Sequence, residues 1–105
     1  MISVAHIASG ADDVIARART ALAALAARPG YLRGTLGRSL DDESQWVLVT
    51  EWSSVGAYRR ALGSYEVRLH ASPLLAEALE LPSSFEPLVQ VAPGGAVTTR
   101  ASDRA

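Results

Sequence analysis

Two histidines are the side chains in this sequence best suited to proton transfer. Histidine titrates between about pH 5 and 8, so either one could act as a general base. His70 falls in an irregular helical stretch, where it could line the mouth of a pocket or lie on the surface. His6 falls beside Ile2 and Val4 in a strand-like segment, where it faces a pocket, faces a subunit contact, or is a satisfied core histidine. Both remain candidates.

Aromatic and basic residues in the middle of the chain form a second group of candidates. Trp52 could contact a small aromatic ligand or simply be the core residue that closes a strand. Tyr58 has the same two interpretations, because helical spacing to Val55 and Leu62 already explains an inward position. Arg68 could hold an anionic ligand or be a solvated helix residue.

Other chemistries lack a pattern in the sequence. The 105 residues include no cysteine, which excludes disulfides, thiolate catalysis and Cys-ligated metal centres. The acidic groups at 12–13 and 41–43 have the positions of a helix cap and a turn, so they do not indicate paired catalytic carboxylates. Metal-ligand spacing, a Gly-rich phosphate loop and a nucleophile elbow are all missing. We therefore expect neither a metal nor a bound cofactor.

Charge and composition indicate one globular domain. The chain is 49% hydrophobic and 20% charged, and its formal net charge is −1. That balance offers no electrostatic basis for binding nucleic acid or an anionic membrane. No segment approaches the ~20 apolar residues that span a bilayer, and the first residues lack the features of a signal peptide. We expect a soluble, cytoplasmic protein.

Hydrophobic periodicity predicts the elements that must position these side chains. Alternating apolar residues favour strands, and spacings of three or four favour helices. Gly and Pro mark the interruptions. The predicted order is strand 2–8, helix 12–28, strand 32–40, strand 46–52, a helical region 55–80 interrupted at 63–64 and restarted at 72–73, and strand 85–92.

This βαββαβ order predicts an α+β protein with a ferredoxin-like fold, in which helices cover one face of a four-stranded antiparallel sheet. Residues 1–92 would form the domain and residues 93–105 a flexible tail. The strands are apolar on both sides. Trp46 and Trp52 each carry roughly 200 Å² of largely apolar area, so leaving both in water is costly. We expect a second copy of the chain to cover the far face, giving a homodimer.

Several motifs resemble the antibiotic biosynthesis monooxygenase (ABM) family. A Pro-Gly-aromatic run at 29–31 follows the first helix, and a strand ends in Trp-x-Ser before an Ala-containing helix. The most specific part is Glu-Trp-Ser-Ser-x-x-Ala-Tyr at 51–58, and the similarity covers roughly residues 2–92. The resemblance implies a dimeric α/β barrel with a pocket between the sheet and helices of each protomer.

Some members of that family oxidise polyketide phenols, anthrones or hydroquinones with dioxygen and no bound cofactor, and others degrade haem. By resemblance, Trp52 and Tyr58 match an Asn-x-x-x-Trp-x-x-x-x-x-Tyr arrangement. There the Asn and Trp polarise the substrate and the Tyr assists proton transfer. The Asn position is Leu48 here, which cannot form a hydrogen bond. Haem-degrading members also need an Asn, so haem degradation is disfavoured, while haem binding through His70 stays open.

The sequence thus predicts a cofactor-independent monooxygenase of small aromatic substrates. We expect the catalytic residues to be Trp52, Tyr58 and His70. The expected substrate-binding residues around them are Leu48, Trp46, His6 and Arg68. The alternative is a non-catalytic dimer that binds a small apolar ligand or serves as a stress or regulatory module.

Overall fold

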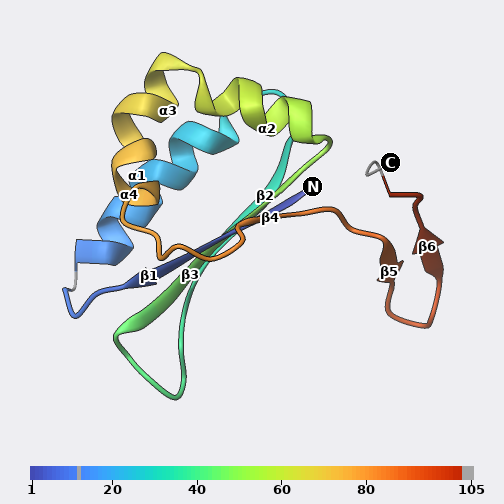
Figure 1. The fold of residues 1–105 in the computed structure, drawn as a ribbon, viewed down its shortest axis with the longest axis horizontal. Helices are drawn as coiled ribbons and strands as arrows, with labels where there is room; N and C mark the ends of the chain where they lie inside the picture. Colours follow the sequence, from blue (N-terminus) through green and yellow to red (C-terminus); the bar gives the residue numbers. More distant parts are fainter. Residues whose placement is uncertain (12, 103–105) are drawn as a thin grey trace.

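The computed structural model describes residues 1–11 and 13–102. Its helices cover one face of a sheet, and a short hairpin near the C-terminus stands apart (Figure 1). In chain order the elements are β1 (Ile2–Ala8), α1 (Asp13–Ala26), β2 (Tyr31–Arg38), β3 (Gln45–Trp52), α2 (Val55–Leu62), α3 (Tyr65–His70), α4 (Ser72–Leu75), β4 (Ser84–Phe85), β5 (Val89–Val91) and β6 (Val97–Thr99).

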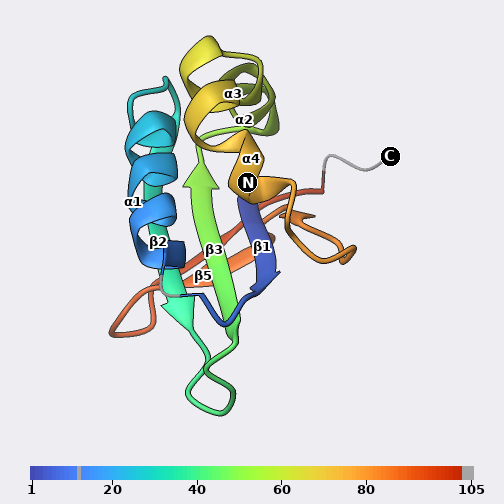
Figure 2. The same ribbon diagram turned by 90° about the vertical axis from the view of Figure 1, so that its left-hand side faces the viewer.

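The main sheet has the order β2-β3-β1-β4, and every neighbouring pair is antiparallel. Figure 2 shows β2, β3 and β1 side by side behind the helices. This arrangement confirms the ferredoxin-like α+β fold predicted from the order of elements. The helical region also breaks where expected, because the Ser54 and Ser64 hydroxyls accept hydrogen bonds from the first turns of α2 and α3.

Both tryptophans lie on the helix-covered face of the sheet, which corrects one step of the sequence interpretation. Alternation along β3 directs Trp46, Leu48, Thr50 and Trp52 toward the helices. Trp46 is 4% exposed and Trp52 is 1% exposed within a single protomer. The tryptophans therefore need no second copy to cover them.

The other face of the sheet has no helix over it (Figure 1). Val47 and Val49 of β3 and Ile2, Val4 and His6 of β1 lie on this face, which we call the open face. All five are only partly buried. The apolar far face inferred from the sequence is thus present, although it is built from four aliphatic side chains and His6 instead of the tryptophans.

The end of the chain differs from the single strand expected over 85–92. Only Ser84–Phe85 pairs with β1, and Pro87 then interrupts the ladder because proline has no N–H to donate. Val89–Val91 pairs instead with Val97–Thr99, across a turn in which Gly94 and Gly95 adopt positive φ.

We call this β5–β6 hairpin the arm. The segment expected to be a flexible tail therefore contains a strand, while residues 103–105 lie outside the described residues. The domain boundary at 92 stays a prediction. None of the described helices is both long and apolar enough to cross a membrane.

Candidate functional site

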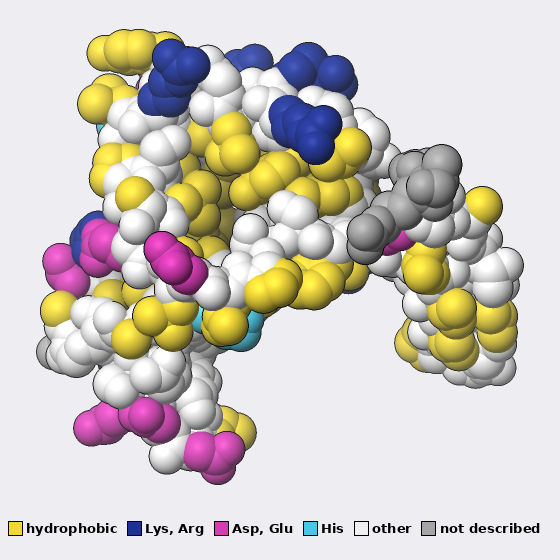
Figure 3. Space-filling model, in the orientation of Figure 1, with side chains coloured by type: hydrophobic (Ala, Val, Ile, Leu, Met, Phe, Trp, Pro, Cys, Tyr) yellow, Lys and Arg dark blue, Asp and Glu magenta, His cyan; other side chains and the backbone are white. Residues whose placement is uncertain are grey.

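A pocket of about 320 Å³ lies between the sheet and the helical layer. Figure 3 shows hydrophobic side chains around the hollow at this position. No charged side chain of the described chain is among the residues that line it. The lining residues come from β1, α2, α4 and the segment after α4, and they are Ser3, Ala5, Tyr58, Leu62, Ser72, Leu75, Ala76, Ala78 and Ser83.

One small polar side chain, Ser3, lies at the base of this pocket, and a second, Thr50, lies beside it on the neighbouring strand. Ser3 of β1 and Thr50 of β3 are directly opposite in the antiparallel register, and both face the helices. They are 4% and 3% exposed, in a core that is otherwise apolar. Buried hydroxyls require hydrogen-bond partners, and each of these has one.

The partners are the two aromatic residues that the sequence singled out. The Ser3 hydroxyl donates to Tyr58 Oη at 3.2 Å. Trp52 Nε1–H donates to Thr50 Oγ1 at 2.9 Å, wholly within the protein interior. The Trp52 and Tyr58 rings also pack against each other with centroids 5.6 Å apart. Trp52 and Tyr58, which were expected separately as site residues, are therefore in contact in the structure.

Helix α2 holds Tyr58 over the sheet through a close contact at its start. Gly30 has φ +88°, and a Cβ placed there would lie 2.5 Å from the Ala57 Cβ. The Ser53 N–H also donates to the Gly30 carbonyl at 2.8 Å.

Trp52 also contacts a second tyrosine, because the Tyr31 ring packs edge-on against it with centroids 5.4 Å apart. Trp52 is thus the middle ring of a three-ring cluster.

The segment after α4 closes the pocket from the outer side of β1. The Leu79 N–H donates to the His6 carbonyl at 2.8 Å, and the Val4 N–H donates to the Ser83 carbonyl at 2.7 Å. Arg17 of α1 forms an ion pair with Glu77 in the same segment. Hydrogen bonding to the Arg17 guanidinium lowers the pKa of the Glu77 carboxyl.

Leu48, Trp46 and Trp52 share the buried face of β3, and none of the three lines the pocket; Trp52 reaches it only through its contact with Tyr58. Leu48 is packed between Ala5 and Leu36 on the neighbouring strands. The Trp46 Nε1–H donates to the Ser9 carbonyl at 3.1 Å. The Arg38 guanidinium lies 4.0 Å from the centre of the Trp46 ring. Their contacts in this protomer are core contacts.

The structure brings neither histidine to the pocket of its own protomer. His6 lies on the open face of the sheet, because it alternates with the inward-facing Ala5 and Ile7. His70 is the last residue of α3, and its Nε2 lies 3.4 Å from Glu66 Oε2. It borders a groove between α1 and α3. Arg68 is exposed on the same short helix. A catalytic role for His70 and binding roles for His6 and Arg68 therefore have no geometric support in the described protomer.

The sequence interpretation missed the small polar groups at the pocket: Ser3, which lines it, and Thr50, which pairs with Ser3 from the neighbouring strand. Ser3 and Thr50 occupy inward positions of strands whose other inward residues are apolar or aromatic. Small hydroxyl residues at such positions are a usable signal, because burying them without a partner is costly. The sequence gives no comparable signal for Ser72 and Ser83, whose positions in the pocket lining are set by the fold.

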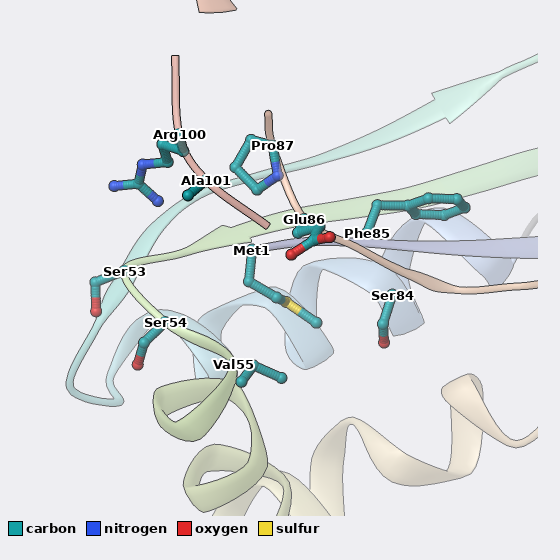
Figure 4. Close-up of a pocket in the computed structure, with 10 residues that line it drawn as sticks. All are labelled: Met1, Ser53, Ser54, Val55, Ser84, Phe85, Glu86, Pro87, Arg100 and Ala101. Atoms are coloured by element: carbon teal, nitrogen blue, oxygen red, sulfur yellow. The ribbon is translucent and has the colours of Figure 1, made fainter. Parts of the chain in front are cut away.

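A second hollow, of about 340 Å³, lies where the chain leaves β4 toward the arm (Figure 4). Met1, Val55 and Phe85 give it apolar walls, and Arg100 and Glu86 reach its edge. Its walls depend on the position of the arm. The hollow between sheet and helices is instead framed by the core, and this makes it the better candidate site.

Residues 2–71 match the family model described as antibiotic biosynthesis monooxygenase. The chain belongs to this family. The match spans most of the sheet and both α1 and α2, so the ABM resemblance drawn from the 51–58 motif is confirmed. No curated protein is significantly similar to the chain in sequence.

Solved structures give the same result for the fold of this ABM protein. SnoaB, a cofactor-independent oxygenase from Streptomyces nogalater, is 26% identical with a TM-score of 0.65, covering 74% of this chain and 82% of its own. Rv0793 from Mycobacterium tuberculosis is 17% identical with a TM-score of 0.60, covering 99% and 97%. A conserved protein from Methanosarcina mazei is 16% identical with a TM-score of 0.63, covering 79% and 84%.

Proposed function

We propose that this ABM protein is a cofactor-independent monooxygenase of small, electron-rich aromatic substrates such as anthrones, phenols and hydroquinones. The observation that carries the proposal is the placement of Tyr58, packed against the buried Trp52 ring, in a largely apolar pocket with a buried hydroxyl at its base. Family membership and the similarity to SnoaB, which is described as a cofactor-independent oxygenase, support it.

For an anthrone-type substrate the reaction balances without an external reductant. The substrate methylene loses two hydrogens and gains one oxygen as a carbonyl, while the second oxygen of O₂ leaves as water. The four electrons that reduce dioxygen all come from the substrate. The protein would bind the ionised substrate, exclude bulk water and stabilise the developing negative charge through hydroxyl donors.

Oxygen-electrode measurements with a panel of anthrones and hydroquinones test the proposal. We expect protein-dependent oxygen uptake that falls at least about tenfold in Tyr58→Phe, because the hydroxyl donor next to the substrate is lost. Trp46→Phe is the control for a general disturbance of the core, since Trp46 is buried on β3 but does not line the pocket. The absence of protein-dependent uptake across the panel would rule the proposal out.

A binding protein without turnover is the second candidate, and two observations favour it. Leu48, at the position of the family's Asn, is buried against apolar neighbours. The Trp52 N–H is already bonded to Thr50, so it is not available to polarise a substrate. This candidate predicts that aromatic ligands raise the melting temperature while oxygen consumption stays at the protein-free rate.

For either function we propose a homodimer in which a second copy covers the open face. The arm supplies the argument. Its apolar side carries Val89, Val91 and Val97, which are 64%, 61% and 61% exposed. An isolated two-stranded hairpin is marginally stable in water, so we expect a second copy of the chain to cover this apolar surface. Figure 3 shows the arm standing away from the body, which leaves space for the partner between the arm and the sheet.

A further inference from the structure

The geometry points to a specificity device at the base of the pocket: Ser3 orients the Tyr58 hydroxyl as a hydrogen-bond donor to one oxygen of an otherwise uncharged aromatic ligand. The inference rests on the proposed function for the kind of substrate, but it concerns binding and is tested without turnover. Ser3 is a positioning residue in this scheme, and Tyr58 is the group that touches the ligand.

The Ser3 and Tyr58 hydroxyls are within hydrogen-bond distance, with 3.2 Å between Ser3 Oγ and Tyr58 Oη. A hydroxyl can accept and donate at once, so with Ser3 as the donor Tyr58 keeps its own hydrogen for another acceptor. The described chain supplies no such acceptor, and Tyr58 borders the pocket. A donor in this position suits a phenol, phenolate or quinone oxygen.

Thr50 keeps Trp52 out of the device. By accepting the Trp52 N–H at 2.9 Å, it satisfies the indole donor within the core, and the Trp52 ring supports the Tyr58 ring without lining the pocket itself. Thr50 faces Ser3 across the β1–β3 ladder, and each of the two hydroxyls forms a hydrogen bond with one aromatic residue, Ser3 with Tyr58 and Thr50 with Trp52. The ligand oxygen therefore has Tyr58 as its donor at this end of the pocket.

The rest of the lining defines what else the ligand carries. The other lining residues are alanines, leucines and serines, without a cation to balance a fixed negative charge. A phenolate oxygen would be paired with the Tyr58 donor, but a second, unpaired charge in such a site is costly. An engineered cavity of about 150 Å³ holds benzene, so about 320 Å³ suits a ligand of two or three fused rings, which share atoms at their junctions. A carboxylate or sulfonate on the ring should prevent binding.

Anaerobic titration calorimetry with three probes tests the inference: 1-naphthol, naphthalene and 1-naphthalenesulfonate. We expect 1-naphthol to bind about fivefold or more tightly than naphthalene, the contribution of one hydrogen bond, and the sulfonate to show no binding. Tyr58→Phe should abolish the advantage of naphthol. Ser3→Ala should reduce it severalfold while leaving naphthalene affinity unchanged, which a purely structural role of Ser3 would not do.

Tyr65→Phe and Ser44→Ala are the matched controls, because Tyr65 is an exposed helix tyrosine and Ser44 an exposed turn serine. Both should bind all three probes as the unaltered chain does. Equal affinities for naphthol and naphthalene, or an advantage that survives in Tyr58→Phe, would overturn the inference. So would binding of the sulfonate. Selective binding without oxygen uptake would instead disprove the monooxygenase proposal and leave the binding device standing.

Discussion

Gly30 lies so close to Ala57 that a β-carbon at position 30 would stand 2.5 Å from the Ala57 Cβ. The contact joins the start of β2 to the first turn of α2, the helix that carries Tyr58. Gly30 also has φ +88°, a conformation that disfavours any side chain. The placement of α2 over the pocket thus depends on the absence of a single methyl group.

We expect Gly30→Ala to lower the free energy of unfolding by about 2 kcal/mol or more, combining positive-φ strain with overpacking. Urea denaturation measures the loss. Gly94→Ala isolates the strain, because Gly94 has φ +90° but no atom within 4 Å of the added Cβ. Gly10→Ala has neither problem and should be near neutral. A loss at Gly30 no larger than that at Gly94 would contradict the packing argument.

Restoring the family's asparagine at position 48 should not restore family chemistry here. Leu48 is 2% exposed and does not line the pocket, so Leu48→Asn buries an amide among apolar side chains. We expect a loss of about 2–4 kcal/mol in stability, from the cavity and the unpaired polar group. Leu48→Met, which conserves volume, should cost less than about 1.5 kcal/mol. Higher oxygen uptake by a stable Leu48→Asn variant would show that position 48 reaches the substrate.

The Arg17–Glu77 ion pair should make stability depend on acid pH. The folded-state pKa of Glu77 is lowered from its ordinary 4.5 by Arg17. The ion pair therefore stabilises the fold at pH values above the pKa that Glu77 has in the unfolded chain. This stabilisation is lost as the pH falls through the lower pKa that Glu77 has in the folded chain. Melting temperatures measured between pH 6 and about pH 3 should fall more steeply for the unaltered chain than for Glu77→Gln.

Glu80→Gln is the matched control for this series, because Glu80 is an exposed neighbour in the same segment. It should keep the acid slope of the unaltered chain. Identical slopes for the unaltered chain and Glu77→Gln would show that the ion pair contributes nothing, as is common for exposed pairs.

The two faces of the arm provide a matched test of the homodimer. Val91 lies on the apolar side of the hairpin and Gln90 on the opposite side. We expect Val91→Asp to shift the chain from dimer to monomer in light scattering coupled to size-exclusion chromatography, because a charge would be buried in the contact. Gln90→Asp should remain dimeric. A chain that is monomeric without any substitution would refute the dimer.

Much of the fold followed from local patterns. Alternation in β3 was sufficient to predict that strand, and the serines before α2 and α3 were sufficient to predict where those helices begin, because binary pattern and capping are local properties. The prediction of a single strand over 85–92 was wrong, and local features of the sequence already argued against it. Pro87 breaks a ladder, and the Val-x-Val run before Pro93-Gly94-Gly95 is mirrored by Val97 after it, a hairpin pattern.

The site was predictable only in part. Trp52 and Tyr58 could be linked through a family motif, and the structure places their rings in contact. The histidines could not be placed, because a shift of one residue along β1 moves His6 to the other face of the sheet. The role of Ser3 depends on its hydrogen bond to Tyr58, a residue 55 positions away in the sequence. Sequence periodicity does not report such pairings.

The segment that closes the pocket has a consequence for solubility. Residues 79–85 occupy the outer side of β1 through hydrogen bonds from Leu79 and to Ser83 and through β4, so this edge of the sheet offers no free ladder to another molecule. The opposite edge, β2, has a register shift between Tyr31 and Arg33 and a second arginine, Arg38, at its end. Irregular, charged edges discourage strand-to-strand stacking. Loss of the 79–85 segment, more than loss of the arm, would therefore turn this sheet into a template for fibril-like aggregation.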